Sequence, residues 1–391
     1  MKRALRAILS LIVATAIWLP CLHVFFRPDM GAFRSTEGVA PEAQALAAAQ
    51  MDLWMNPGLR AREIERMRKS NAEWDFMART FFVLSLANMG FRDPGGKELY
   101  LEIMDRIIDE TIQLEQEHGV YYFRMDYARA GSFVSEQGRS LFLDGEIALM
   151  IAVRRLLEEN EVYRPMLSER VSTMVEYMQE SPVLSGESYP DECWMFCNTI
   201  ALAAVRIADV LDGTDHSAFL KQWLDVAKGK LVDERTGLLI SSFSFEGIPY
   251  DGPEGSSIWM VAHCLQVVDK PFATDQYRRA KLELAANVLG FGYAREWPVT
   301  WRGPVDIDSG PIVPALDISA GSSGQALIAA CAFGDDAYLS SLLTSLNFGG
   351  FPVTENGRLR YCAGNQLGDA VVLYSMVLGP VWEEVERRSG S

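Results

Sequence analysis

The chain has 391 residues, 49% of them hydrophobic and 23% charged, which is enough apolar material for one large core or two ordinary ones. The formal net charge of −16 argues against a nucleic-acid partner, which would need a basic face. Six scattered cysteines are too few for a disulfide scaffold.

Residues 1–27 have the pattern of a membrane anchor or signal sequence. Lys2, Arg3 and Arg6 precede an apolar run from Ala7 to Phe26, in which His23 is the only titratable base. Twenty helical residues at ~1.5 Å each reach about 30 Å, enough to span a bilayer. We find no clean small-x-small cleavage site, which favours an uncleaved anchor over a removed signal peptide. The positive-inside rule then predicts an extracytoplasmic body on the periplasmic side, or a secreted body if the segment is cleaved.

A linker over residues 28–40 leads to one domain, expected over residues 41–385. Amphipathic or apolar periodicity predicts helices over residues 41–69 with a break near 56–58, and over 71–89, 96–117, 141–158, 162–179, 217–230, 256–268, 275–289, 322–332, 336–346 and 367–378. One more helix starts within the stretch from Ser188 to Val205. Residues 120–128 look like a short strand, 236–249 like a hairpin, and 297–319 like a long loop rich in Pro and Gly.

The order of these segments is repetitive. Six times, a loop rich in Gly, Pro, aromatic and acidic residues leads into a mostly apolar helix, and shorter amphipathic helices lie between. The six starts are near Asp75, Gly145, Cys197, Ser257, Gly324 and Gly368. Apolar helices inside and amphipathic helices outside predict an all-α (α/α)6 toroid of six helical hairpins, with short β-hairpins inserted on the long-loop face. A superhelical stack of helix pairs is the competing fold.

In such a toroid, the starts of the inner helices converge on the axis and should form the site. Helix N-termini favour anionic groups, so each acid there has a simple capping role as its alternative. Glu146 differs because it lies inside the apolar run L-F-L-D-G-E-I-A-L-M, and a buried carboxyl has the raised pKa that a general acid needs. The candidate catalytic residues are Glu146, Cys197, Asp144 and Asp191. The candidate substrate-binding residues are Asp75, Ser188, Tyr189, Cys193, Trp194, Glu254, Ser257 and Trp259.

The sequence predicts neither a metal nor a cofactor. Cys193 and Cys197 are spaced to share a helical face, but no histidine lies near them in sequence to complete a zinc site. No Walker loop, dinucleotide fingerprint or nucleophile elbow is present. Aromatic residues gather on the long-loop face with few cations among them. Such a surface suits a sugar or an apolar substrate that forms a carbocation.

The sequence resembles the linalool dehydratase-isomerase family. The resemblance is most specific in Cys197-Asn198-Thr199, in D-V-L-D-G-T-D-H-S-A-F-L-K-Q-W-L-D-V (209–226) and in L-V-D-E-R-T-G (231–237), and it extends loosely over residues 70–380. It implies an (α/α)6 toroid, a secreted or periplasmic location, cofactor-free acid/base chemistry on a terpene alcohol, and a homo-oligomer.

The family's site residues are only partly kept. The family has two cysteines nine positions apart at this junction, and the second matches Cys197 while the first falls on Ser188. Pro190 and Asp191 follow as the family pattern expects. The family histidine on the preceding inner helix falls on Glu146. Linalool itself is therefore not implied as the substrate.

Three functions follow from these observations. The first is a membrane-anchored lyase or isomerase acting on a small apolar or alcohol substrate of alkenyl type. Glu146 would then be the general acid, and Cys197 with Asp144 or Asp191 would move the second proton. The second is a carbohydrate-active enzyme in which carboxylates such as Glu146 and Glu254 stand ~6.5–9.5 Å apart. The third is a non-catalytic binding or accessory protein of the same fold.

Overall fold

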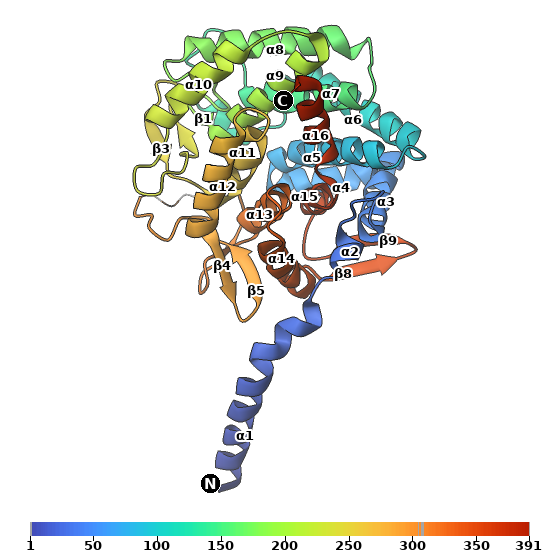
Figure 1. Cartoon of the computed structure of the whole chain (residues 1–391), viewed down its shortest axis with the longest axis vertical. Coiled ribbons are helices and arrows are strands. Elements are labelled where there is room, and N and C mark those ends of the chain that lie inside the picture. The colour runs from blue at the N-terminus through green and yellow to red at the C-terminus, as the bar shows by residue number, and fades with distance from the viewer. Residues whose placement is uncertain (1, 304, 306–308, 391) are drawn as a thin grey trace.

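Six inner helices form a closed ring in the computed structural model, which describes residues 2–303, 305 and 309–390 (Figure 1). They are α5 (Ala72–Arg92), α7 (Leu141–Leu157), α9 (Met195–Asp212), α11 (Gly255–Leu265), α13 (Ala320–Ala332) and α15 (Gln366–Val377). Each contacts the next, and α15 contacts α5 again. Every residue of α7 is buried, as an apolar helix inside a ring requires. These contacts confirm the expected closed ring and exclude an open stack.

The outer layer consists of amphipathic helices. These are α6 (Lys97–His118), α8 (Tyr163–Glu180), α10 (Ser217–Lys230), α12 (Lys270–Leu284) and α14 (Asp336–Gly349). The sixth outer position is taken by α3 (Pro41–Met55), which contacts both α15 and α6. A segment from the start of the body therefore completes the hairpin that α15 begins. Helix α4 (Pro57–Ser70) continues from α3 after the break expected near residues 56–58.

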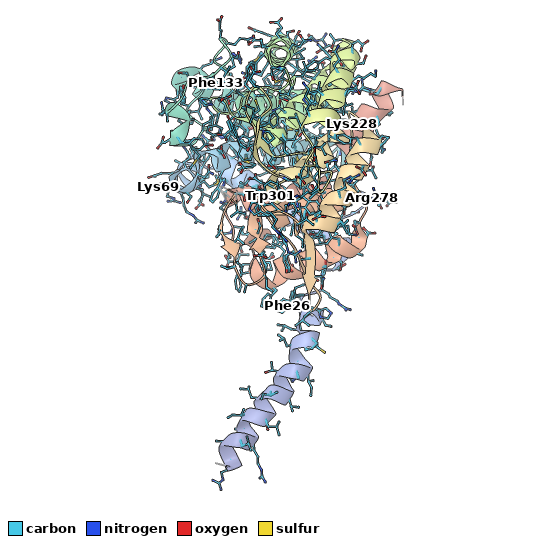
Figure 2. All side chains as sticks on the ribbon, turned by 90° about the vertical axis from the view of Figure 1, so that its left-hand side faces the viewer. Phe26, Lys69, Phe133, Lys228, Arg278 and Trp301 are labelled. Atoms are coloured by element: carbon cyan, nitrogen blue, oxygen red, sulfur yellow. The ribbon has the colours of Figure 1, made fainter. Side chains whose placement is uncertain are left out.

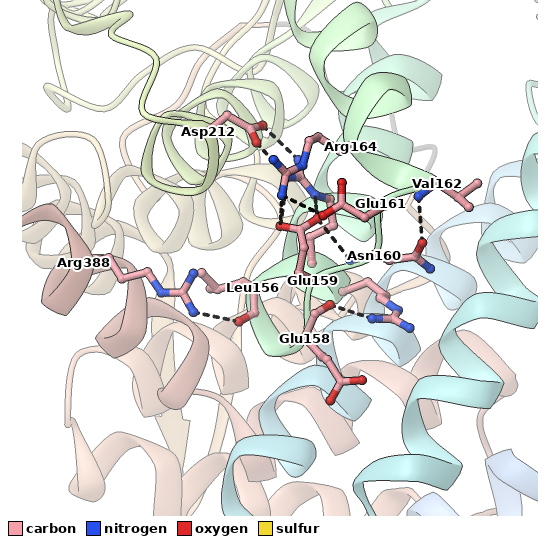
Figure 3. A network of polar contacts seen from close by, with 11 residues as sticks. Leu156, Glu158, Glu159, Asn160, Glu161, Val162, Arg164, Asp212 and Arg388 are labelled. Carbon is pink, nitrogen blue, oxygen red and sulfur yellow. Dashed lines mark hydrogen bonds and ion pairs between the residues drawn. The ribbon is translucent and has the colours of Figure 1, made fainter.

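The last helix closes one end of the ring. Helix α16 (Pro380–Ser389) lies across α5, α7 and α9 near their C-terminal ends. The Trp382 ring stacks on His263 at a centroid distance of 4.9 Å, and its indole nitrogen donates to the His263 carbonyl over 3.1 Å. Arg388 donates to the Leu156 carbonyl over 3.3 Å (Figure 3). The ring is thus blocked at this end, and any pocket must open at the other.

A buried arginine joins two inner helices near this closed end. Arg155 of α7 donates to both oxygens of Asp212 on α9, over 2.9 and 2.7 Å, and to Glu159 beyond its own helix. Figure 3 shows this network around Asp212 and Glu159. Because the guanidinium is buried, two carboxylates are needed to offset its desolvation.

Small sheets occupy the loops between helices. Strands β1 (Cys193–Trp194), β2 (Ser242–Phe243) and β3 (Pro249–Asp251) form one sheet, and β4 (Ala285–Val288), β5 (Phe291–Ala294), β7 (Ile318–Ser319) and β6 (Ile312–Val313) form another. Strands β8 (Pro352–Glu355) and β9 (Arg358–Tyr361) pair as a hairpin that the sequence reasoning missed. The hairpin expected over residues 236–249 is present as β2 and β3. The loop expected over 297–319 contains β6 and β7, and its residues 304 and 306–308 lie outside the described residues.

Two local predictions were wrong. The helix expected to reach Leu289 ends at Leu284, because residues 285–294 form the β4–β5 hairpin with a left-handed turn at Leu289 and Gly290. The piece expected as a strand over residues 120–128 is a series of turns followed by the short helix η2 (Asp126–Arg129). The Arg124 side chain bonds the Val120 carbonyl over 2.7 Å, which holds the chain in a turn.

The N-terminal segment projects from the body as α1 (Lys2–Trp18) (Figure 1). Residues Arg3–Phe33 contain a stretch long and apolar enough to cross a membrane, with a mean hydropathy of 2.2 and no burial within the body. The following η1 (Leu19–Phe26) and α2 (Met30–Phe33) connect it to the domain. Figure 2 shows Phe26 where the projecting helix meets the body. This segment has the properties of a signal sequence or an anchor.

Trp382 should be essential for the closed end. Replacing it with Ala removes a buried ring and its hydrogen bond, so we expect the free energy of unfolding to fall by about 3–5 kcal/mol. Urea unfolding followed by circular dichroism measures this. Arg387→Ala on the exposed face of the same helix should change the midpoint little. Equal stability of Trp382→Ala and wild type would mean that α16 does not pack across the ring.

Candidate active site

A pocket lies at the N-terminal ends of the inner helices, and all six of them contribute to its wall. Its volume is about 130 Å³, similar to a cavity that holds a benzene-sized molecule. The lining residues are Asn71, Glu73, Trp74, Met77, Tyr127, Phe142, Ser188, Tyr189, Trp194, Phe196, Cys197, Ser256, Ser257, Ser309, Gly321, Gln325 and Leu367. The expected convergence of helix starts on the axis is therefore found.

Cys197 and Ser188 face each other in this pocket. Cys197 is in the first turn of α9, and burial raises the pKa of its thiol well above the usual value, with the nearby Ser188 hydroxyl acting in the opposite direction. Electrostatic interaction with the carboxyl groups of Glu146 and Glu73 raises the pKa of Cys197 further. Cys197 is therefore a neutral thiol at neutral pH and is not poised as a nucleophilic thiolate.

The loop before α9 is held in place through its backbone. The Ser188 carbonyl accepts hydrogen bonds from Ser140 Oγ over 2.7 Å and from Arg124 Nη1 over 3.1 Å. Ser140 is the residue immediately before α7, so this contact fixes Ser188 over the start of that helix. Ser188 lines the pocket, and its buried hydroxyl interacts with the Cys197 thiol and has no nitrogen or oxygen hydrogen-bond partner among the described residues.

Glu73 and Tyr189 form the acidic part of the wall. Glu73 is in the first turn of α5, and it accepts a short hydrogen bond from the Tyr189 hydroxyl. That hydroxyl also accepts from the Met125 amide over 3.0 Å, and the Tyr189 ring stacks on Tyr127 at 4.7 Å. A carboxyl group that accepts a hydrogen bond from a phenol is held in one orientation, as a base or a cation-stabilising group needs to be.

Glu146 lies one turn below the pocket floor. It is four residues after the lining residue Phe142, so both occupy the same face of α7. The Thr80 hydroxyl of α5 donates to its carboxyl group over 2.5 Å. Burial, together with the nearby charge of Glu73, raises the pKa of Glu146 to about 8, although the Thr80 bond lowers it. Glu146 is therefore protonated at neutral pH.

Two of the expected acids are paired with arginines outside the pocket. Asp144 bonds Arg139 over 2.8 Å and makes a short ion pair with Arg170 on the outer helix α8. Because it is two residues from Glu146, it is turned by about 200° around α7 and points away from the axis. Asp75 bonds Arg79 over 2.9 Å and likewise does not line the pocket. Both are positioned as ion-pair residues between helices.

Four other expected residues also lie outside the pocket wall. Asp191 accepts hydrogen bonds from the Phe245 amide and the Tyr250 hydroxyl, which ties together neighbouring loops. Cys193 is in β1, where its buried thiol is directed at the Ser185 carbonyl. Glu254 is at the N-cap position of α11. Trp259 is fully buried towards the outer helices, about 6 Å from the rings of Tyr277 and Tyr338.

Ser188, Tyr189, Trp194, Cys197 and Ser257 are brought together in the pocket as expected. The residues that sequence reasoning missed are Glu73, Trp74, Met77, Tyr127, Phe142 and Gln325 among others. A signal for Glu73 was present, since Arg79 four residues after Asp75 marks Asp75 as an ion-pair residue, and Glu73 lies on the other side of the helix. Within the described residues, no group of three or more His, Cys, Asp or Glu is placed to hold a metal.

Comparison with known proteins bears on this site directly. A sequence model of the linalool dehydratase/isomerase family matches residues 152–367, more than half of the chain. The chain belongs to the linalool dehydratase/isomerase family. The matched range includes Ser188 and Cys197 of the pocket, whereas Glu73 and Glu146 lie before it. The family resemblance expected from the sequence is confirmed.

Other comparisons add little to this family membership. A search of curated proteins found no match. Among solved structures, a GH76 alpha-mannanase from Bacteroides thetaiotaomicron, solved as a selenomethionine derivative, is similar at 8% sequence identity and a TM-score of 0.47, covering 80% of this chain and 87% of that chain. Similarity at this level supports no conclusion about the present chain.

Glu146 should make stability depend on pH. Because its pKa is raised from 4.5 to about 8 by folding, its favourable contribution is complete below pH 4.5 and is lost as pH rises through 8. The difference in unfolding free energy between wild type and Glu146→Gln should therefore shift in favour of the variant over this range. Urea unfolding at several pH values measures the difference.

Thr80→Val is a useful second variant for this measurement. It removes the hydroxyl that stabilises the ionised carboxylate, so it should extend the loss of stability to higher pH. Parallel pH profiles for wild type and Glu146→Gln between pH 4.5 and 8 would contradict the raised pKa.

Proposed function

We propose that this member of the linalool dehydratase/isomerase family is a cofactor-free hydro-lyase or isomerase acting on an alkenyl alcohol. One observation carries the proposal. A neutral thiol at the family position, Cys197, lines an aromatic pocket and interacts electrostatically with the buried, protonated carboxyl group of Glu146. No Lys, Arg or His is among the described lining residues, and aromatic walls of this kind stabilise a developing carbocation.

The first step breaks the bond between carbon and the hydroxyl oxygen. The Cys197 thiol gives its proton to the substrate hydroxyl as it receives one from Glu146, so that water leaves and an allylic cation remains. A relay of this kind avoids a free thiolate, which the raised pKa of Cys197 makes costly. The electrostatic coupling between Cys197 and Glu146 supports the pairing.

The second step removes a proton from the carbon next to the cation and forms the alkene. Glu73 is suited to this role because it lines the pocket and is oriented by Tyr189. Its negative charge also stabilises the cation before deprotonation. In an isomerisation, the released water instead returns to the other end of the allylic cation, and the proton goes back to the acid.

This assignment differs from the family arrangement at two positions. Ser188 stands where the family has its first cysteine, and Glu146 stands at the histidine position. A protonated carboxyl with a pKa of about 8 can replace an imidazolium as proton donor. Asp144 and Asp191, which were expected to move the second proton, lie outside the pocket wall, and Glu73, which lines the pocket, takes that role in this proposal.

Removal of either proton carrier should abolish most of the activity. We expect Glu146→Gln and Cys197→Ala each to lower kcat by about 10²–10⁴-fold, as is typical when a general acid is lost. Wild-type kcat should fall as pH rises through about 8, where Glu146 ionises. Gas chromatography of pooled C5 and C10 alkenyl alcohols, scored for loss of water or rearrangement, measures the turnover.

Cys331→Ala is the matched control, because this buried thiol lies in α13 away from the pocket and its loss should leave turnover unchanged. Unchanged turnover in Glu146→Gln would contradict the proposed acid. Hydrolysis of oligosaccharides offered in the same screen, without dehydration of any alcohol, would favour the carbohydrate-active alternative. Binding without any turnover would favour an accessory protein.

We further propose that the N-terminal helix remains attached as a membrane anchor. The segment after it is packed into the body, since Phe26 contacts the Phe348 ring at 5.0 Å and its carbonyl accepts from Asn347 over 3.1 Å. Phe33 is 1% exposed, and Arg34 bonds carbonyls of Cys331 and Leu378. Cleavage near Phe26 would remove part of this junction.

Membrane fractionation tests the anchor. The intact chain should sediment with membranes and dissolve only in detergent, and intact-mass analysis should find residues 2–27 still present. A chain lacking residues 1–18 should be recovered in the soluble fraction with its fold unchanged. A soluble mature protein that begins after Phe26 would contradict this proposal.

A further inference from the structure

The pocket wall holds two buried oxygen atoms, Ser309 Oγ and Gln325 Oε1, that have no hydrogen-bond partner among the described residues. A third buried oxygen, Ser188 Oγ, interacts with the Cys197 thiol and has no nitrogen or oxygen partner there. A buried polar atom without a partner costs free energy, and such atoms are rare in folded proteins. Two such atoms, Ser309 Oγ and Gln325 Oε1, in the wall of one cavity indicate hydrogen-bonding positions that a bound molecule would fill.

These three atoms lie at two separate positions in the pocket wall. We call them the first pole, formed by Ser188, and the second pole, formed by Ser309 and Gln325. Ser188 is fixed over the start of α7 by the bond from Ser140 to its carbonyl. Gln325 is in α13, and Ser309 lies against the first turn of the same helix, where a Cβ on Gly321 would come within 3.1 Å of the Ser309 carbonyl. In the ring order α5, α7, α9, α11, α13, α15, helices α7 and α13 are opposite each other. The poles therefore lie on opposite walls.

The wall between the poles is largely apolar. Trp74, Met77, Phe142, Phe196 and Leu367 all line the cavity. An anionic ligand is disfavoured because Glu73 is in the wall and no cationic side chain is among the described lining residues. The cavity thus suits a neutral molecule with a hydrocarbon middle and an oxygen function at each end.

We propose that the substrate carries a second hydroxyl or carbonyl group, bound by Gln325 and Ser309, at the end away from the reacting hydroxyl. The reacting hydroxyl lies at Ser188 and Cys197. This inference rests on the proposed function for the reaction at Ser188 and Cys197. It adds the substrate class, which is an alkenyl alcohol with a second oxygen function rather than one with a single hydroxyl group. An amide and a hydroxyl can donate and accept, so they recognise either group.

Gln276 provides a matched control for Gln325. It is fully buried in α12 and both ends of its amide are bonded, to the Leu239 amide over 2.9 Å and to the Gly237 carbonyl over 3.0 Å. Replacing Gln276 with Leu removes satisfied hydrogen bonds far from the pocket. Replacing Gln325 with Leu removes a buried oxygen atom in the pocket that has no hydrogen-bond partner among the described residues. The two substitutions should have opposite effects on stability.

The experiment compares two pairs of alcohols at two chain lengths. The pairs are 3-methylbut-2-en-1-ol with 2-methylbut-2-ene-1,4-diol, and linalool with 8-hydroxylinalool. Binding is followed by quenching of tryptophan fluorescence, since Trp74 and Trp194 line the pocket, and turnover by gas chromatography. Wild type, Gln325→Leu, Ser309→Ala and Gln276→Leu are compared, together with their thermal unfolding midpoints without ligand.

In at least one of the two pairs, we expect wild type to bind the diol at least 10-fold more tightly than the alcohol with a single hydroxyl group. Gln325→Leu should remove about 10-fold of this preference, the equivalent of one hydrogen bond, while raising the unfolding midpoint. Ser309→Ala should weaken diol binding in the same direction. Gln276→Leu should lower the midpoint and leave the preference unchanged.

Equal binding of diol and simple alcohol in both pairs, or a preference that Gln325→Leu and Ser309→Ala leave intact, would overturn the inference. If simple alcohols were turned over with no such preference, the proposed function would stand and the inference would fail. If a diol bound with the expected dependence on Gln325 but was not turned over, the second pole would be confirmed and the proposed reaction would be wrong.

Discussion

Six helices that are apolar on every side can be buried only against one another and a surrounding layer, and this constraint determines the rest of the structure. Closing them into a ring brings their polar N-terminal ends to one place and their C-terminal ends to another. Helix α16 occupies the second end. The loops lie at the first end, where their side chains and the first turns of the six helices together form the wall of the pocket.

Burial has opposite consequences for two neighbouring acids of α7, Asp144 and Glu146. Asp144 gains two arginines and becomes part of the joint between α7 and the outer layer, whereas Glu146 gains one hydroxyl and remains protonated. The two carboxyl groups are two residues apart on one helix and therefore face different sides of it. In this ring fold, two acids only two residues apart therefore have different roles. Asp144 forms ion pairs that stabilise the fold, and Glu146 is a protonated group beneath the pocket.

Much of this arrangement could be predicted from the sequence, because the inner helices are distinguished by composition and their starts by the loops before them. Ser188, Tyr189, Trp194, Cys197 and Ser257 could be placed in the site for that reason. The choice of Asp75 over Glu73 failed because it ignored the angle between them on the helix. The roles of α3 and α16 could not be predicted, since ring closure depends on long-range packing that leaves no periodic signal in a short segment.

The sixth hairpin joins the beginning of the body to its end, because α3 packs against α15. During synthesis, α3 and α5 emerge first and remain without their neighbour until the last helices have been made. Contacts between residues so far apart in sequence form slowly, and apolar faces stay exposed until they do. If the N-terminal helix is held at a membrane while the chain is made, as we propose, the ring would close beside that surface.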